Sequence, residues 1–291
     1  MEIKYFDIHS HLGFEDLSAQ AGFGTDQKEV IQKMHELGVA TITIGTGLES
    51  SKEVVRLASE DENIWACIGN HPDDNSNETF DENDYEELVK NPKVVAIGEC
   101  GLDYFRFEGK FNKGLSLRRS EATGKGESLV EFFGSEKTKQ KEEFIKQIEF
   151  AVKYNKVLML HVRDNKEAKG EAYNDAYNIL KKYEGKVRGN MHFFAGDLEW
   201  AKKFIELGYT ISFTGVITFA KQYDEVIKSI PLEFIHAETD APFVAPVPHR
   251  GERNEPVFVI DVVKKIAEIR GEDFEKVRIQ LLENAKRVFG L

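Results

Sequence analysis

The stretch Val94-Val95-Ala96-Ile97-Gly98-Glu99-Cys100 places a carboxylate directly after five apolar or small residues. Apolar, β-branched runs of this length indicate buried strands. Seven other runs along the chain have a similar β-rich, apolar composition. The eight expected strands are Tyr5–His11, Ala40–Gly45, Ile64–Asn70, Val94–Cys100, Val157–Val162, Arg188–Phe194, Tyr209–Thr214 and Phe234–Asp240.

Amphipathic segments separate these strands and are long enough for crossover helices, which implies that the strands pair in parallel. Eight such βα units in 291 residues fit a single (β/α)₈ TIM barrel over residues 1–291. An open doubly wound sheet is the alternative. Against it, no glycine-rich phosphate loop follows the first strand. The expected helices are Gln27–Leu37, Ser51–Glu60, Asp84–Lys90, Lys139–Tyr154, Lys169–Tyr183, Leu198–Leu207, Tyr223–Ser229, Val257–Arg270 and Phe274–Phe289.

The composition is that of a globular protein, with 41% hydrophobic and 31% charged residues. No run approaches the roughly 20 apolar residues that a membrane span needs, and no signal-peptide pattern precedes the first strand. With only two cysteines, a disulfide framework is not expected, and a cytoplasmic location is the simplest interpretation. The net charge of −12 argues against a protein that coats duplex nucleic acid. It does not exclude an enzyme whose metal ions supply positive charge locally.

One segment breaks the alternation of strands and helices. Residues 106–137 contain five glycines, and six basic residues lie between Arg106 and Lys125. Loops this long in compact domains are usually functional. Because it follows the end of a strand, we expect it to be a long loop over the mouth of the barrel, either guiding a nucleic acid strand or simply solvated.

Metal-binding residue types stand at the ends of the expected strands. His9 and His11 are two apart in the first strand, so both imidazoles point to one face. A carboxylate or imidazole also ends four later strands, at positions where burial is costly unless the group is paired or metal-bound. Barrel enzymes hold their active sites at this end of the strands. The candidate metal ligands are His9, His11, Glu99, His161, His192 and Asp240.

Four histidines with two carboxylates and no thiolate suit Zn²⁺, Mn²⁺ or Mg²⁺. Six ligands are more than one tetrahedral ion needs, so we expect two divalent metal ions with Glu99 as the bridge. Two ions about 3.5–4 Å apart activate water and stabilise both the attacking and leaving oxygens. Asp240 is the candidate base that accepts the proton from that water.

With these residues in place, the sequence resembles the TatD family of metal-dependent deoxyribonucleases, within the amidohydrolase-like barrels. The resemblance runs through the whole chain and implies that the six candidate ligands are the metal-site residues and that nucleotides are removed from DNA ends. The matching blocks, in family order, are Asp7-Ile8-His9-Ser10-His11-Leu12, Gly69-Asn70-His71-Pro72, Ile97-Gly98-Glu99-Cys100-Gly101-Leu102-Asp103-Tyr104, His161-Val162-Arg163-Asp164, His192-Phe193-Phe194-Ala195-Gly196, Glu238-Thr239-Asp240-Ala241-Pro242 and Gly251-Glu252-Arg253-Asn254-Glu255-Pro256, with Asn284 and Phe289.

Three features depart from the family pattern. The family usually has His-Pro-His where this chain has His71-Pro72-Asp73, and His-Cys-Phe-Ser-Gly where it has His192-Phe193-Phe194-Ala195-Gly196. The third is the segment 106–137, which is much shorter in most members. These departures bear on substrate choice more than on the chemistry.

Four further residues are candidate substrate contacts. His71 follows the third strand and is expected to face the mouth. Arg163 lies two residues beyond His161 and either binds phosphate or forms a structural salt bridge. Arg253 and Asn254 either contact phosphate and sugar or anchor their loop. His236 is interpreted as a core residue.

The leading hypothesis is a two-metal deoxyribonuclease that acts on single-stranded DNA ends, with nucleic acid as substrate and no membrane or obligate protein partner. The second is a barrel hydrolase of another ester or amide bond, such as an aminoacyl-tRNA deacylase, because the same activated water serves both reactions. An apolar pocket without an arginine cluster would favour this second hypothesis. The third, a metal-free binding scaffold, conflicts with the complete ligand set.

Overall fold

In the computed structural model, eight parallel strands follow one another around the molecule in chain order. The structure describes residues 2–13, 26–73, 78–105, 129–165 and 169–291. Each strand pairs in parallel with the next, which gives the sheet order β1 to β8. The strands are β1 (Tyr5–Ser10), β2 (Val39–Ile44), β3 (Ile64–Ile68), β4 (Val94–Asp103), β5 (Val157–Arg163), β6 (Gly189–His192), β7 (Thr210–Phe213) and β8 (Ile235–Ala237).

The segment after β8 returns to β1 and brings the sheet into a nearly closed barrel. The backbone N–H of His11 donates to Ala241 O at 2.7 Å, and that of Asp240 donates to His9 O at 2.9 Å. The fully buried Asp7 adds to this seam by accepting hydrogen bonds from the backbone N–H and the hydroxyl of Thr239, at 2.8 and 2.6 Å. These contacts confirm the TIM barrel and exclude the open sheet.

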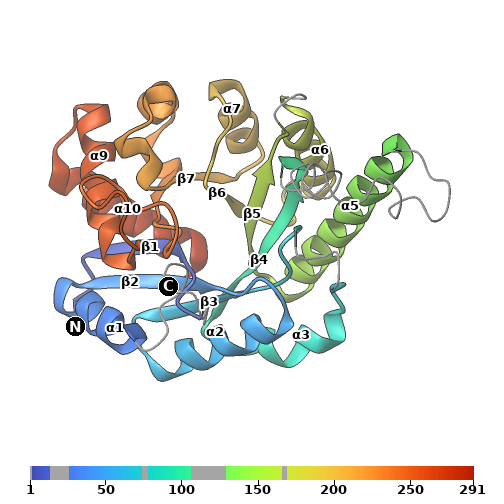
Figure 1. Cartoon of the computed structure of the whole chain (residues 1–291), viewed down its shortest axis with the longest axis horizontal. Coiled ribbons are helices and arrows are strands. Elements are labelled where there is room, and N and C mark those ends of the chain that lie inside the picture. Colours follow the sequence, from blue (N-terminus) through green and yellow to red (C-terminus); the bar gives the residue numbers. More distant parts are fainter. Residues whose placement is uncertain (1, 14–25, 74–77, 106–128, 166–168) are drawn as a thin grey trace.

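Helices surround the strands, as Figure 1 shows. A large hydrophobic cluster fills the layer between strands and helices. A smaller one combines side chains of β1 to β5 with the last turns of the C-terminal helix, which is the composition of a barrel interior covered at one end. The helices are α1 (Gln27–Leu37), α2 (Leu48–Glu60), α3 (Glu82–Val89), α5 (Leu129–Tyr154), α6 (Glu171–Leu180), α7 (Leu198–Glu206), α8 (Asp224–Ser229), α9 (Val259–Arg270) and α10 (Phe274–Phe289).

The expected mouth loop over residues 106–137 is too long, because α5 already begins at Leu129. Gly134 is one of the five glycines on which the expectation of a loop rested, since glycine lowers helix stability by about 1 kcal/mol. Tertiary contacts outweigh this preference. Lys137 pairs with Glu171 at 2.8 Å, and its ammonium lies 4.7 Å from the centre of the Tyr104 ring. The basic part of the segment, residues 106–128, lies outside the described residues.

Two features bear on expectations drawn from composition. Cys67 and Cys100 are both buried and free. None of the helices in the described part of the chain has the length and apolarity that a membrane span needs.

Candidate metal centre

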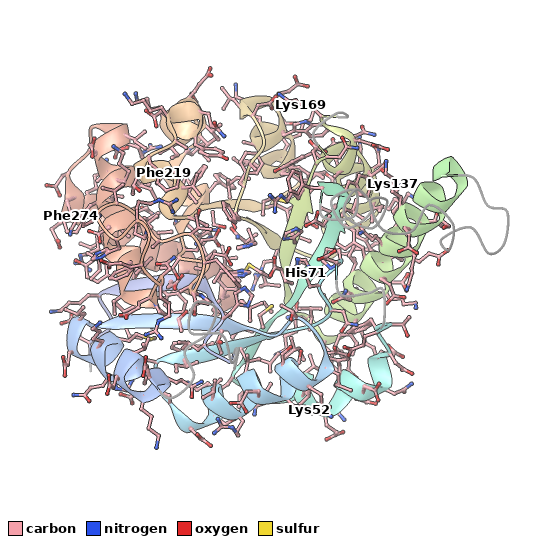
Figure 2. The ribbon with its side chains drawn as sticks, viewed as in Figure 1. Lys52, His71, Lys137, Lys169, Phe219 and Phe274 are labelled. Carbon is pink, nitrogen blue, oxygen red and sulfur yellow. The ribbon has the colours of Figure 1, made fainter. Side chains whose placement is uncertain are left out.

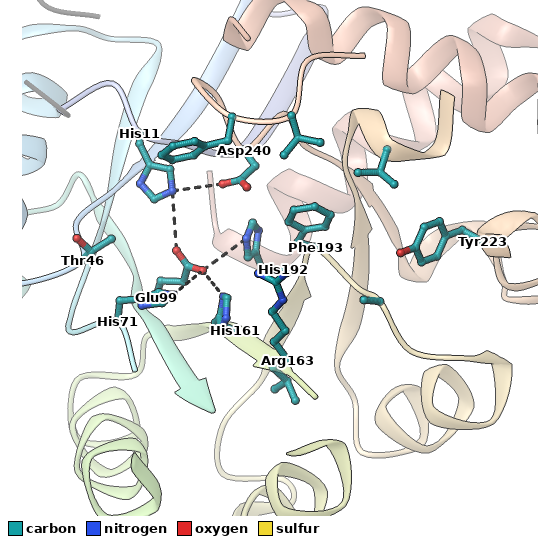
Figure 3. A pocket seen from close by; sticks show the side chains of 15 residues that line it. His11, Thr46, His71, Glu99, His161, Arg163, His192, Phe193, Tyr223 and Asp240 are labelled. Atoms are coloured by element: carbon teal, nitrogen blue, oxygen red, sulfur yellow. Dashed lines mark hydrogen bonds and ion pairs between the residues drawn. The ribbon is translucent and has the colours of Figure 1, made fainter. Parts of the chain in front are cut away.

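The six candidate ligands come together at the carboxyl ends of the strands, around Glu99. In Figure 3, the dashed lines from His11, His71, His161 and His192 converge on its carboxylate. The whole-molecule view in Figure 2 places His71 near the centre of the ring of strands, with Lys52 on the outer edge. His9, His11, Glu99 and His192 are at most 5% exposed. The site is therefore enclosed by the barrel.

The two oxygens of Glu99 face two different pairs of histidines. Oε1 lies 2.7 Å from His161 Nδ1 and 3.5 Å from His192 Nε2. Oε2 lies 3.5 Å from His9 Nε2 and 3.9 Å from His11 Nε2. In each triad, Glu99 with its two histidines, the ligand atoms lie within 4.8 Å of one another. One carboxylate thus belongs to two adjacent ligand groups.

Asp240 joins the group formed by His9 and His11. Its Oδ1 lies 3.3 Å from His11 Nε2 and 3.7 Å from His9 Nε2. The residue has a left-handed backbone conformation, with φ of 56°. Such a conformation costs a residue other than glycine of order 1–3 kcal/mol and is held here by the hydrogen bond to β1.

Glycines on both sides of Glu99 allow β4 to lie against β5 at this point. A Cβ atom on Gly98 would lie 2.3 Å from Met159 O, and one on Gly101 would lie 2.1 Å from His161 O. The pairing of β4 with β5 is irregular between Ile97 and Cys100. Close approach and an irregular register together turn the Glu99 side chain into the cavity, which explains the glycines in this block.

Two further carboxylates orient the histidines by contacting their outer ring nitrogens. Asp103 Oδ2 lies 2.9 Å from His161 Nε2, and Glu238 Oε2 lies 3.0 Å from His192 Nδ1. Both carboxylates are completely buried. Each leaves the other ring nitrogen directed at Glu99, as expected for histidines that bind metal. Asp103 was not identified as a site residue from the sequence, although it stands in the same block as Glu99.

The donor set fits divalent cations. The Nε2 atoms of His9 and His11 lie 3.2 Å apart and both face carboxylates. The His9 and His192 rings are stacked at 3.4 Å between centroids, which brings further nitrogen donors to the same place. A cation between these nitrogens and carboxylates would satisfy all of them, because neutral imidazole and ionised carboxylate are both good ligands.

Burial and neighbouring charge shift the titration of this cluster. Burial alone would raise the pKa of Glu99, but the adjacent imidazoles, His192 first, hold that pKa well below its ordinary value. The pKa of Asp240 is lowered in the same way, with the hydrogen bond from His11 as the largest effect opposing burial. Burial lowers the pKa of His192, but Glu238 and Glu99 outweigh it and raise this pKa to about 9. The lowered pKa values mean that the carboxylates of Glu99 and Asp240 are ionised at neutral pH.

Two of the four candidate substrate residues line the cavity, namely His71 and Arg163. His71 Nδ1 accepts a hydrogen bond from the backbone N–H of Asp73 at 3.1 Å, so in the neutral ring the proton is on Nε2. That nitrogen lies 3.7 Å from Glu99 Oε1 and acts as a donor at the centre of the site. The Arg163 guanidinium lies 4.1 Å from the centre of the Phe105 ring and forms no ion pair with any described residue.

The other two candidates, Arg253 and Asn254, do not line the cavity. Arg253 pairs with Asp26 at 3.2 Å and with Glu255 at 3.7 Å. Asn254 is completely buried, and its amide nitrogen donates to Thr239 O at 2.8 Å and to Phe243 O at 2.5 Å. Both amide hydrogens of Asn254 thus anchor the loop after β8, which is the alternative role for this residue.

The cavity has a volume of about 490 Å³ and an apolar side that was not expected from the sequence. One of its apolar residues, Val162, belongs to β5, and the others come from the loops after β6, β7 and β8. Two of these residues, Phe193 and Val244, have left-handed backbones, with φ of 44° and 53°. We call this side the apolar wall; it consists of Phe193, Ala195, Val216, Tyr223, Phe243 and Val244.

A TIM barrel that gathers buried histidines and carboxylates at the carboxyl ends of its strands defines a metal-dependent hydrolase. The comparisons with known proteins lead to the same class. A family model described as TatD related DNase matches residues 6–290, and the chain belongs to this family.

The similar proteins match over nearly their whole length. YabD of Bacillus subtilis, a metal-dependent hydrolase, is 35% identical, with 98% of each chain covered. The 3′-5′ ssDNA/RNA exonuclease TatD of Shigella flexneri is 29% identical, with 92% of this chain and 95% of that protein covered. Among solved structures, the TatD homologue YjjV of Escherichia coli is 25% identical over the full length of both chains, with a TM-score of 0.78.

Proposed function

We propose that this protein hydrolyses phosphodiester bonds at the ends of single-stranded nucleic acid, DNA in the first place, and that it uses two divalent metal ions to do so. The observation that carries the proposal is the position of Glu99 between two pairs of histidines. A carboxylate with one oxygen toward each pair is the arrangement that a two-ion site requires. The similarity to a protein named as a single-stranded exonuclease supports the choice of substrate.

Two bound ions would lower the pKa of water and stabilise charge on the phosphate oxygens. His9, His11 and Asp240 would hold one ion, His161 and His192 the other, with Glu99 shared.

The remaining steps belong to side chains that line the cavity. Asp240 is ionised and reaches the cavity, so its carboxylate can accept the proton of the attacking water. The Nε2–H of His71 can donate to a phosphate oxygen, and Arg163 can pair with the phosphate at the rim. These roles need no residue outside the described cavity.

The test combines metal analysis of the purified protein with digestion of end-labelled single-stranded DNA, with and without a chelator. We expect about two ions per chain and shortening that the chelator stops. Glu99→Ala and His161→Ala should lose both bound metal and the shortening of DNA, since each variant removes a metal ligand. Glu87→Ala and His35→Ala are matched controls with exposed or half-exposed side chains, paired to Lys90 and Asp61. Full activity of the ligand variants would refute the proposal.

A second candidate is hydrolysis of another ester, such as an aminoacyl ester. It is favoured by the apolar wall and by the absence of Arg253 from the cavity. An aminoacyl-tRNA assay with the same variants separates the two. Loss of aminoacyl ester hydrolysis in Glu99→Ala, with no shortening of DNA by the wild type, would favour this candidate.

A further inference from the structure

The cavity at the metal centre has two chemically different halves. The half formed by β1 to β5 and their loops presents His11, Thr46, His71, Glu99, His161 and Arg163. The other half, formed by β6 and the loops after β6 to β8, holds the apolar wall together with His192 and Asp240. Figure 3 shows His11, His71 and Glu99 on one side and Phe193 and Tyr223 on the other, with His192 beside Phe193. When the reacting ester of a substrate lies at Glu99, the part of the substrate that extends toward the loops after β6 to β8 therefore meets the apolar wall.

Hydrogen bonds fix the backbone of the first loop of this wall. The N–H of Phe193 donates to Glu238 Oε1 at 2.6 Å, and that of Ala195 donates to the Tyr173 hydroxyl at 3.1 Å. The left-handed backbone of Phe193 is thereby held in place, and its ring lines the cavity beside His192. The loop is preorganised, since no rearrangement is needed before a ligand enters.

The loop after β8 is fixed as firmly. Asn254 holds Phe243 O, and Arg250 donates to Ala245 O at 3.0 Å. The Phe243 ring lies 6.0 Å from the His11 ring, and the side chain is 41% exposed, which is unusual for a phenylalanine. A large apolar side chain left open beside a catalytic centre is typical of a ligand-binding surface.

We propose that the apolar wall is a subsite for a planar aromatic ring attached to the group that is cleaved. Given the proposed function, on which this assignment rests, the ring is the base of the terminal nucleotide. Three aromatic residues, Phe193, Tyr223 and Phe243, line this half of the cavity. Base–aromatic stacking does not depend on the identity of the base, so the subsite selects a nucleotide without selecting its sequence.

The test measures binding of small product-like ligands to the metal-loaded protein by calorimetry. The first pair is deoxyadenosine 5′-monophosphate and 2-deoxyribose 5-phosphate, which differ by the base. We expect the nucleotide to bind about 5- to 150-fold more tightly, the range for stacking of one base. The second pair is phenyl phosphate and butyl phosphate, which tests planarity against apolar character alone.

The variants are Phe193→Ala and Phe243→Ala, with Phe219→Ala as the matched control. Phe219 is 45% exposed, stacks on Arg250 and does not line the cavity. We expect each wall variant to reduce the preference for the base-bearing ligand at least several-fold and to leave the affinity for deoxyribose phosphate unchanged. Phe219→Ala should behave as wild type. Metal content is measured in parallel, so that a loss of affinity caused by a displaced His192 and lost metal can be distinguished from a loss of ring binding.

The outcomes separate the subsite from the proposed function. A preference for the rings that the wall variants lose, in a protein that does not shorten DNA, supports the subsite and refutes the nuclease. Shortening of DNA with equal affinity for ligands with and without a ring refutes the subsite alone. Equal affinity for phenyl and butyl phosphate, or no measurable affinity for any of the four ligands, also overturns the proposal.

Discussion

Replacing Glu238 with glutamine should weaken metal binding without removing any metal ligand. The carboxylate is completely buried and accepts three hydrogen bonds, from Phe193 N at 2.6 Å, His192 Nδ1 at 3.0 Å and Ser212 Oγ at 2.9 Å. In Glu238→Gln, the amide oxygen of the glutamine has to accept the hydrogen bond from the backbone N–H of Phe193. The amide NH₂ then faces His192 Nδ1, which has to become an acceptor.

The consequence falls on the opposite nitrogen of the same ring. A neutral imidazole with an acceptor Nδ1 carries its proton on Nε2, the atom that lies 3.5 Å from Glu99 Oε1. That nitrogen can no longer donate its lone pair to a cation. Loss of such a supporting carboxylate lowers metal affinity about 10- to 100-fold, or about 1.4–2.7 kcal/mol.

The assay is a metal titration against a chromophoric chelator, with nitrogen NMR of the metal-free protein above the His192 pKa of about 9, where the ring is neutral and its tautomer can be read. Asp103→Asn is a companion variant that should shift the proton of His161 in the opposite sense, from Nε2 to Nδ1. Glu268→Gln is the control, because that side chain is 71% exposed and pairs only with Lys265 among the described residues. Unchanged affinity together with an unchanged His192 tautomer in Glu238→Gln would refute the reasoning.

Three other predictions follow from buried groups. His236 is completely buried, with no hydrogen-bond partner for either nitrogen among the described residues, and burial first and Arg287 second lower its pKa to about 3. Below about pH 6.5 the His236 imidazole binds a proton in the unfolded chain but stays neutral in the folded chain. The free energy of unfolding should therefore fall by about 2 kcal/mol from pH 6.5 to 5. Urea unfolding of His236→Leu should lack this part of the loss; an identical pH dependence in both proteins would contradict it. Gly101→Ala would place a methyl group 2.1 Å from a carbonyl oxygen of β5, and we expect a loss of more than about 2 kcal/mol and of metal, measured by thermal unfolding and metal analysis. If the Gly101→Ala protein is stable and binds metal fully, the close approach of Gly101 to the β5 backbone is not required. Asn254→Ala removes the amide donor of the Thr239 carbonyl, in a buried hydrogen bond, and of the Phe243 carbonyl, in a part-buried one. This should cost about 2–3 kcal/mol in urea unfolding and lower nucleotide affinity, whereas Asn174→Ala, at an exposed side chain, should do neither.

The order of strands and the positions of the ligands followed from local patterns. A run such as Val157–Leu160 has to be buried, and the polar residue after it marks where the strand leaves the core. Because parallel strands in a barrel end at one face, His161, His192 and Asp240 were expected near one another. This expectation needed only the period of a strand and the rule that parallel strands share a direction.

Other features depend on partners that are distant in the sequence. The start of α5 at Leu129 reflects contacts of Lys137 with Glu171 and Tyr104, which outweigh the local effect of Gly134. The role of Asn254 could not be derived either. An asparagine after a strand is equally suited to bind substrate or to hold a loop, and only the positions of two carbonyl oxygens decide between them.

By itself, the sequence determined a parallel barrel with histidines and carboxylates at its mouth, because hydrophobic period and residue chemistry act locally. The tertiary structure alone decided which pair of histidines faces each oxygen of Glu99, that Asp103 and Glu238 orient the rings, and that three loops form an apolar wall beside them. The physical reason is that each of these arrangements depends on distances between segments that only the closed barrel brings together.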